Sequence, residues 1–282
     1  MRFCSALALA LLACATPSAP LPAQTVTPPT AVARPNEPAG FVAVAAHDAN
    51  TVPALHGSPW WFAGGRLAVV QDPERGAVWQ TFYPTGFQAG LASVNVGPRP
   101  WADQRAFYWS GWLKLVGTNW ENQATVTKIL GFWEHADGKL SAATTVGIPN
   151  QGQTQPGGAF VLDVREQQPL VRNIEPNVDK RPLLTAGAWH HVETLFTLNA
   201  LGQANGTAKI WIDGTLTVSA ANVVWRTAAK PRGFFGWKWN PTWGGGNIVV
   251  NGVSKLQIKS RYDAARLDDL YMSGVPCGAG GC

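Results

Sequence analysis

Short apolar runs separated by glycine, proline and asparagine follow one another from Phe41 to Gly274, and this pattern limits the possible fold most strongly. Runs of this kind are typical of the strands of a β-sandwich. No stretch shows the sustained spacing of an amphipathic helix. Only 14% of the residues are charged and 14 residues are Trp, which also favours a β protein over a helical bundle. We therefore expect one all-β, antiparallel two-sheet sandwich domain over residues 41–276.

Strand patterns are clearest in a series of segments with alternating or continuous apolar residues. In chain order these segments are 66–71, 76–82, 105–116, 125–133, 159–164, 189–198, 207–212, 216–218, 248–250 and 265–273. The polar stretches 150–158 and 172–185 lack this pattern, and we expect them to be loops.

Two of these segments are joined by Asp213-Gly214, a pair that favours the tight turn of a β-hairpin. Along segment 189–198, alternation places His190 and Val192 on one face together with Thr194 and Phe196. The apolar members indicate that this face meets the core. His191 and Glu193 are then expected to share the opposite, outward face.

The N-terminus has the pattern of an export signal. An apolar run at 7–13 is too short to span a bilayer, and it ends at Cys14 in a sequence that resembles the lipobox of bacterial lipoproteins. On this interpretation residues 1–14 are a signal peptide and Cys14 is the lipid anchor, which gives a membrane-anchored protein of the periplasm or cell surface. Ordinary cleavage after Ala15 or near Ala23 is the alternative, and it gives a secreted protein.

Residues 15–40 are rich in Pro, Ala and Thr, a composition that favours an extended spacer. Such a segment fits a tether to a membrane surface, and it fits an unstructured leader equally well. At the other end, residues 277–282 form a Cys-Gly tail. Cys277 and Cys282 are expected to pair as a disulfide in an oxidising compartment.

No further ligands accompany these two cysteines, so we expect neither a metal site nor a cofactor. The formal net charge is +5 without a run of Lys or Arg. This mild excess is compatible with an acidic polysaccharide as partner and does not favour nucleic acid. We expect a monomer whose only membrane contact is the lipid anchor.

The segment WHHVETLFTLNALGQANGTAKIWIDGTL (189–216) resembles the strand pair of the concanavalin A-like lectin/glucanase superfamily. Further matches, closest to bacterial jelly-roll proteins related to polysaccharide lyases, are FYWSGWLKL, Asn119-Trp120, VTKILGF, PTWGGG and LDDLYMSG. The resemblance covers about Arg66 to Gly274 and implies a jelly-roll sandwich. It leaves the activity open, because the superfamily holds lectins, hydrolases, lyases and adhesion domains.

A retaining glucanase needs two carboxylates about 5 Å apart. The nearest candidate, WEHADG at 133–138, ends in Asp-Gly and is better explained as a turn. A lyase acting on a uronate polymer instead needs groups that neutralise the carboxylate, remove the C5 proton and protonate the leaving oxygen. His191, Glu193, Lys128 and Tyr271 are the candidate catalytic residues.

Each candidate has an alternative interpretation. His191 and Glu193 can simply pair with each other, the facing of Lys128 is ambiguous, and Tyr271 can be a half-buried sandwich aromatic. The signatures of the familiar alginate lyases, Gln-Ile-His and Tyr-Phe-Lys-Ala-Gly, are absent.

A cluster of aromatic residues suggests carbohydrate binding. Trp237, Lys238, Trp239 and Trp243 together have the composition of a platform on which sugar rings stack, although tryptophans of a sandwich also fill its core. The sequence thus supports a polysaccharide lyase, a non-catalytic lectin-like domain or a structural display domain.

Overall fold

The computed structural model describes residues 32–49, 60–63, 66–92, 95–98, 103–117, 120–121, 127–133, 142–148, 159–166, 172–229, 231–243, 248–278 and 281–282. Residues Val32 to Cys282 belong to one compact unit. The export signal, Cys14 and most of the predicted spacer lie outside the described residues. Within the described part, no helix is long and apolar enough to cross a membrane.

All regular structure in the described residues is β-strand, as the sequence predicts. The strands are β1 (Val42–His47), β2 (Trp60–Ala63), β3 (Leu67–Asp72), β4 (Gly76–Tyr83), β5 (Leu91–Ala92), β6 (Asn95–Pro98), β7 (Gln104–Val116), β8 (Thr127–Trp133), β9 (Ala142–Ile148), β10 (Ala159–Phe160), β11 (Asp163–Glu166), β12 (Arg172–Ile174), β13 (Leu184–Thr185), β14 (Trp189–Thr197), β15 (Gly206–Ile212), β16 (Thr215–Val223), β17 (Gly236–Trp243), β18 (Ile248–Val250), β19 (Val253–Lys255) and β20 (Asp263–Pro276).

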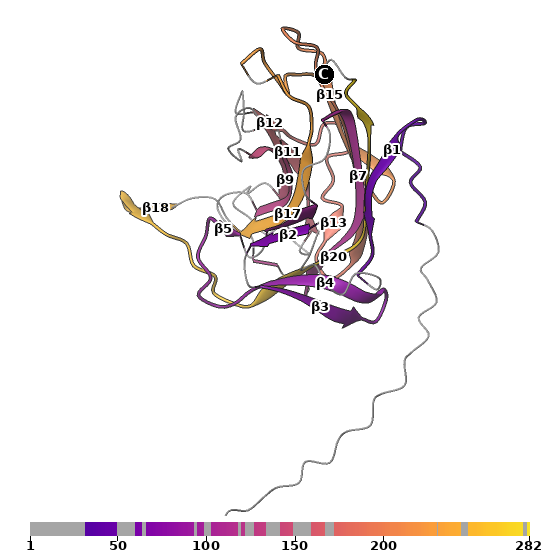
Figure 1. Cartoon of the computed structure of the whole chain (residues 1–282). Coiled ribbons are helices and arrows are strands. Elements are labelled where there is room, and N and C mark those ends of the chain that lie inside the picture. The colour runs from indigo at the N-terminus through magenta and orange to yellow at the C-terminus, as the bar shows by residue number, and fades with distance from the viewer. Residues whose placement is uncertain are drawn as a thin grey trace, which may run out of the picture. The chain divides into compact units, whose positions relative to one another are not determined.

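Most of these strands form two eight-stranded antiparallel sheets (Figure 1). Sheet A has the order β16-β15-β14-β7-β20-β4-β3, and β1 also pairs with β20. Sheet B has the order β12-β11-β9-β8-β17-β6-β2, and β5 also pairs with β17. Strands distant in the sequence are neighbours in both sheets. The chain is an all-β, antiparallel jelly-roll sandwich, which is the predicted fold class.

One apolar core joins the two sheets. Trp109 and Val192 enter it from sheet A, and Val164 and Trp239 enter it from sheet B. Among the residues that the structure describes, six tryptophans are less than 2% exposed, and they are Trp79, Trp109, Trp120, Trp225, Trp239 and Trp243. Burial of one large apolar side chain contributes about 1.5–3 kcal/mol, so these residues contribute much of the stability of the core.

The predicted hairpin between β15 and β16 is present, with Ile212 paired to Thr215. Asp213 and Gly214 both have positive φ, 49° and 76°, which is the backbone of the tight turn that Asp-Gly favours. Ile210 and Ile212 are buried in the core. The alternation inferred from the sequence therefore sets the facing of this hairpin correctly.

Some sequence predictions of loops and strands are wrong. The stretch 172–185, predicted as a loop, contains the short strands β12 and β13. The predicted strand 159–164 is divided into β10 and β11, and β11 continues to Glu166. These strands have only two to four residues. Segments this short carry too few alternating positions for a period to be recognised.

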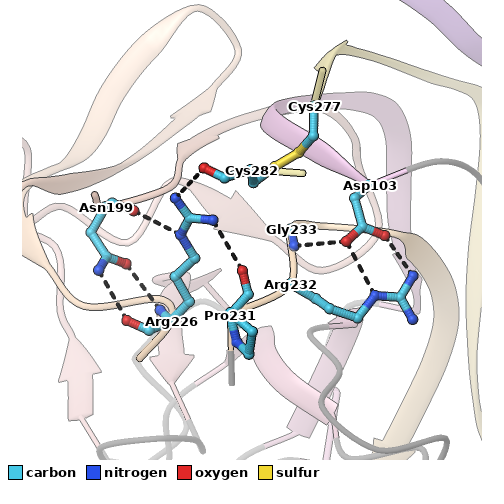
Figure 2. The surroundings of a disulfide bond; sticks show 8 residues. All are labelled: Asp103, Asn199, Arg226, Pro231, Arg232, Gly233, Cys277 and Cys282. Atoms are coloured by element: carbon cyan, nitrogen blue, oxygen red, sulfur yellow. Dashed lines mark hydrogen bonds and ion pairs between the residues drawn. A yellow bond between two sulfur atoms is a disulfide. The ribbon is translucent and has the colours of Figure 1, made fainter. Parts of the chain in front are cut away.

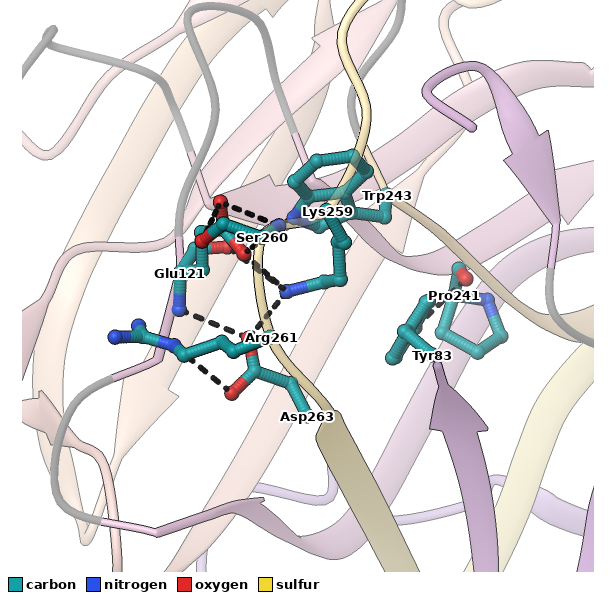
Figure 3. Close-up of polar contacts among 8 residues, drawn as sticks. All are labelled: Tyr83, Glu121, Pro241, Trp243, Lys259, Ser260, Arg261 and Asp263. Atoms are coloured by element: carbon teal, nitrogen blue, oxygen red, sulfur yellow. Dashed lines mark hydrogen bonds and ion pairs between the residues drawn. The ribbon is translucent and has the colours of Figure 1, made fainter. Parts of the chain in front are cut away.

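Strand β17 was not predicted because Pro241 interrupts its pattern. Trp239 pairs with Leu130 and Thr242 with Lys128, so Pro241 lies in the irregular region between these two pairs. A proline is tolerated at a bulge because no ladder bond is required of its nitrogen. Its carbonyl oxygen accepts a hydrogen bond from the hydroxyl of Tyr83 at 2.8 Å (Figure 3).

A disulfide between Cys277 and Cys282 fixes the C-terminal tail (Figure 2). Arg226 donates from Nη2 to the Cys282 carbonyl oxygen at 2.8 Å and from Nη1 to that of Pro231 at 3.0 Å. A Cβ added at Gly233 would lie 2.8 Å from the Cys282 sulfur. The tail is therefore packed against the segment that leads into β17.

Candidate functional site

His191 and Glu193 lie on the face of sheet A that is turned away from the core, as the alternation along β14 predicts. Val192 and Phe196, on the opposite face, belong to the core. Both polar residues are nevertheless buried, since His191 is 9% exposed and Glu193 is 0% exposed. What covers them decides whether they act on a polymer.

Residues 34–37, which we call the N-terminal strap, cover Glu193. Asn36 donates from Nδ2 to Glu193 Oε2 at 2.8 Å and from its backbone nitrogen to Oε1 at 3.3 Å. The Tyr108 hydroxyl donates to Oε1 at 2.6 Å. Burial, together with this carboxylate, raises the pKa of Tyr108, which keeps the hydroxyl protonated. The spacer predicted for 15–40 therefore ends earlier than expected.

The strap also occupies Tyr271. The Tyr271 hydroxyl donates to Glu37 Oε1 at 2.8 Å, and the Arg34 guanidinium lies 3.8 Å from the centre of the tyrosine ring. The Tyr271 and Tyr108 rings are 6.3 Å apart. The structure thus brings Tyr271 close to Glu193, but it uses the hydroxyl to hold the chain's own N-terminal residues.

His191 is held between aromatic and acidic neighbours. Its ring lies 5.1 Å from that of Trp112, and its Nδ1 is 3.8 Å from Glu193 Oε2. Burial lowers the pKa of His191 more than the nearby carboxylates raise it, so the imidazole is neutral. The cluster is a closed polar layer on sheet A. The strap covers Glu193, whereas Tyr271 and Trp112 stay half-buried. The catalytic role of His191, Glu193 and Tyr271 stays a prediction.

We expect the free energy of unfolding to fall as the pH is lowered from 7 to 5, and to fall less in the His191→Gln variant. Burial keeps the pKa of folded His191 below the unfolded value of about 6.5, so the unfolded chain binds the proton more tightly. One such group changes the free energy by at most about 1.4 kcal/mol per pH unit. Urea denaturation of both proteins at both pH values measures the effect, and equal pH dependences would contradict it.

His190, on the core side of β14, forms a local clamp that the sequence did not reveal. Its Nδ1 lies 2.7 Å from Asp213 Oδ2, and its Nε2 accepts a hydrogen bond from the Thr185 backbone nitrogen at 3.0 Å. The Thr185 hydroxyl is also near, at 2.8 Å. Because the backbone amide takes the Nε2 lone pair, His190 does not activate that hydroxyl. The clamp fixes the turn before β14 to the hairpin turn.

The predicted tryptophan platform is largely wrong. Trp239 is 1% exposed and Trp243 is 0% exposed, and both belong to the core. The Trp243 indole nitrogen donates to the Glu121 carbonyl oxygen at 2.7 Å. The side chains of Trp237 and Lys238 lie outside what the structure describes. Two of the three tryptophans predicted to bind sugar, Trp239 and Trp243, are therefore core residues.

Lys128 is separated from the His191 cluster because it belongs to sheet B. It is half-buried and pairs with Thr242 on β17 and with Gly147 on β9. Gly147 in turn pairs with Asp163. In the next row, Leu130 and Val146 are paired across the same four strands with Trp239 and Val164, which are buried in the core. The pair of Asp163 and Gly147 is therefore next to the core row, and Lys128 joins this pair across a register shift between Lys128 and Leu130.

A further basic row lies in sheet B. Lys238 pairs with Gly131, Gly131 with Thr145, and Thr145 with Arg165. Strand register places these four positions on the other side of the core row from Gly147. The sequence missed Arg165 because the strand prediction stopped at Val164. Polar residues on both sides of buried Val164 are the alternation signal that would have extended it.

Glycines lie between the basic positions of this sheet. Gly131 separates Lys238 from Thr145, and Gly147 lies next to Lys128. Neighbouring strands are about 4.8 Å apart, so the basic and glycine positions lie close together. Gly131 and Gly147, at the centre, carry no side chain. Among the described residues, no group of three or more His, Cys, Asp or Glu is arranged to hold a metal ion. The arrangement fits a chemistry based on basic side chains.

No family model and no curated protein matches this chain. Solved structures of polysaccharide lyases are similar to it. Alginate lyase Aly36B, in a variant bound to an alginate trisaccharide, is 14% identical, with a TM-score of 0.58 over 83% of this chain and 98% of its own. The endo-β-1,4-glucuronan lyase of the fungus Trichoderma reesei is 15% identical, with a TM-score of 0.54 over 83% and 96%.

Alginate lyase vAL-1 from Chlorella virus is 14% identical, with a TM-score of 0.54 over 83% of this chain and all of its own. This chain therefore covers nearly the full length of each of these enzymes. At such identities the likeness establishes the jelly-roll fold.

Proposed function

We propose that this protein is an exported polysaccharide lyase that cleaves a uronate-containing glycan by β-elimination. The observation that supports it is the strand register of sheet B, which brings the positions of Lys128, Lys238 and Arg165 together around Gly131 and Gly147. Fixed positive charges attract and orient the carboxylates of an acidic glycan. Glycines between them leave room for sugar rings.

The reaction assigns a different task to each basic residue. Arg165 and Lys238 neutralise uronate carboxylates, which makes the neighbouring C5 proton more acidic. Lys128 removes that proton as the general base. The electron pair of the C5–H bond forms the C4–C5 double bond, and the bond from C4 to the glycosidic oxygen breaks. The ammonium formed on Lys128 returns its proton to the leaving oxygen. No water is added and no cofactor is consumed.

The alternative of hydrolysis finds less support. A retaining or inverting hydrolase uses a pair of carboxylates. In the described residues of β8, β9, β11 and β17, the two rows with basic residues carry one acidic position, Asp163. The fold shared with alginate and glucuronan lyases also supports elimination over hydrolysis.

Export is part of this proposal, because a polymeric substrate lies outside the cell. The apolar run before Cys14 supports it. Mass spectrometry of the mature N-terminus distinguishes a lipid on Cys14 from cleavage after Ala15 or near Ala23.

We expect the purified protein to release products with the ultraviolet absorbance of an unsaturated sugar from a polyuronate, because elimination leaves a C4–C5 double bond conjugated to the carboxylate. The matched control is the same polymer with its carboxyl groups reduced to alcohols, which is expected to remain intact. New reducing ends without this absorbance would indicate hydrolysis and contradict the proposal. Retention on the polymer without cleavage would favour the lectin-like alternative.

A further inference from the structure

The hairpin β18–β19 and the residues that follow it form an arm, which we define as residues 248–262. Figure 1 shows its β18 end extending away from the two sheets. Eight large apolar side chains of the described residues are exposed, and four of them lie on the arm. They are Val253 at 58%, Leu256 at 45%, Ile258 at 54% and Tyr262 at 55% exposure. Exposed apolar residues concentrated in this way mark a binding surface.

The arm is an ordered element with a defined turn. Asn251 and Gly252 have φ values of 51° and 76°, as in the tight turn of a two-residue hairpin loop. Val250 pairs with Val253, and Ile248 pairs with Lys255. β18 and β19 pair with no other strand among the described residues. An isolated hairpin is only marginally stable in water, so a binding partner would stabilise it further.

Backbone hydrogen bonds fix the base of the arm to the segment after β4. The Lys259 nitrogen donates to the Phe87 oxygen, the Gly86 nitrogen to the Lys259 oxygen, and the Ala89 nitrogen to the Gln257 oxygen, each at 2.9 Å. The C-terminal part of the arm is therefore paired with the segment after β4.

The side chain of Lys259 strengthens this base (Figure 3). Lys259 is 1% exposed, and its Nζ pairs with Asp263. The same ammonium lies 4.9 Å from the centre of the Trp120 ring and 4.6 Å from that of Trp243. Such cation–π contacts are stronger when desolvated. The exposed apolar residues are thus carried on a rigid base.

The charge of the arm indicates its partner. Residues 248–262 contain Lys255, Lys259 and Arg261 and no acidic residue. Lys259 is buried, and Arg261 is half-buried with its Nε 3.6 Å from Asp263 Oδ1, which leaves Lys255 as the exposed cation of the arm. An acidic glycan offers a carboxylate to Lys255 and apolar ring faces to Tyr262, Leu256 and Ile258. Two copies of the arm would instead bring like charges together.

We propose that the arm is a second glycan-binding surface, separate from the basic positions of sheet B, that holds the polyuronate. This inference rests on the proposed function for the identity of the polymer. The binding itself requires no cleavage.

The test compares a triple variant with a matched control. The arm variant is Lys255→Glu with Leu256→Ser and Ile258→Ser. The control carries Lys180→Glu with Val178→Ser and Leu201→Ser, which change an exposed lysine and two exposed apolar residues elsewhere. Retardation in native gels containing a polyuronate measures binding, and size-exclusion chromatography measures the oligomeric state.

We expect the arm variant to bind the polymer about tenfold more weakly than the control, with a smaller salt dependence. Its cleavage of a short uronate oligosaccharide is expected to stay unchanged. Equal polymer binding by the two variants would overturn the proposal, and so would a shift from dimer to monomer in the arm variant alone. A wild-type protein that binds but releases no unsaturated product would refute the proposed function and leave the arm standing.

Discussion

Replacement of Lys128 by alanine is expected to lower kcat/KM for β-elimination by about 10²–10⁴-fold, the usual contribution of a general base. Lys128 lies in sheet B, paired with Thr242 and Gly147. Without its amine no group at that position accepts the C5 proton. Initial rates of absorbance increase on a polyuronate measure the loss.

Two further substitutions separate proton removal from charge. Arginine keeps a positive charge but does not deprotonate in proteins, so Lys128→Arg is expected to be as inactive as Lys128→Ala if the amine is the base. If Lys128→Arg is more active than Lys128→Ala, the role of Lys128 is to neutralise a uronate carboxylate and not to remove the proton. Lys180→Ala, which changes an exposed lysine, is the control and is expected to keep full activity.

The two candidate sites predict opposite activities for the His191→Gln and Lys128→Ala variants. His191 is 9% exposed beneath the strap, so His191→Gln is expected to keep its activity at pH 7. Loss of activity in a folded His191→Gln protein, with activity retained in Lys128→Ala, would place the chemistry on sheet A and contradict our assignment.

The sequence predicted the strands well where apolar and polar residues alternate over a long segment. β14 has nine residues and β15 has seven, which is enough for the apolar positions to define a face, and Asp213-Gly214 defines the turn after β15. The short strands, β1, β9 and the proline-containing β17 were missed because local pattern does not encode pairing with a distant strand. Their structure depends on neighbours such as Leu130, far away in the chain.

The site was harder to predict for the same reason. Alternation correctly turned Glu193 away from the core, but an outward face is not an exposed face. Asn36 covers it from 157 residues away in the chain, within a segment whose composition predicts a spacer. The sequence prediction placed Lys128 and His191 in one site, although they lie on different sheets. Alternation shows which side chains of a strand share a face, but it does not show which sheet the strand joins.

Replacement of Lys259 by methionine is expected to lower the free energy of unfolding by about 3–5 kcal/mol, the usual cost of removing one partner of a buried ion pair. Asp263 keeps Arg261 as a more distant partner, at 3.6 Å. Burial lowers the pKa of Lys259 although Asp263 opposes this, which shows how little solvent the ammonium meets. Methionine fills a similar volume but leaves Asp263, 5% exposed, without this partner. Urea denaturation at pH 7 measures the loss.

The double variant Lys259→Met with Asp263→Asn tests the cause. The asparagine side chain carries no charge, and its oxygen can still accept the hydrogen bond that the Glu121 backbone nitrogen donates to Asp263. The double variant is therefore expected to be more stable than Lys259→Met alone. Arg181→Met, which removes an exposed partner of Asp179, is the matched control and is expected to leave the midpoint unchanged.

A double variant as unstable as Lys259→Met would show that the cation–π contacts, and not the charge left on Asp263, carry the effect. Hydrogen exchange gives a local measure of the same pair. Because Gly86 and Ala89 donate to the base of the arm, their amides are expected to exchange faster in Lys259→Met than in the double variant. Unchanged exchange at both amides would mean that the arm keeps its base without the lysine, and the rigidity on which we base its role would have to come from the backbone pairing alone.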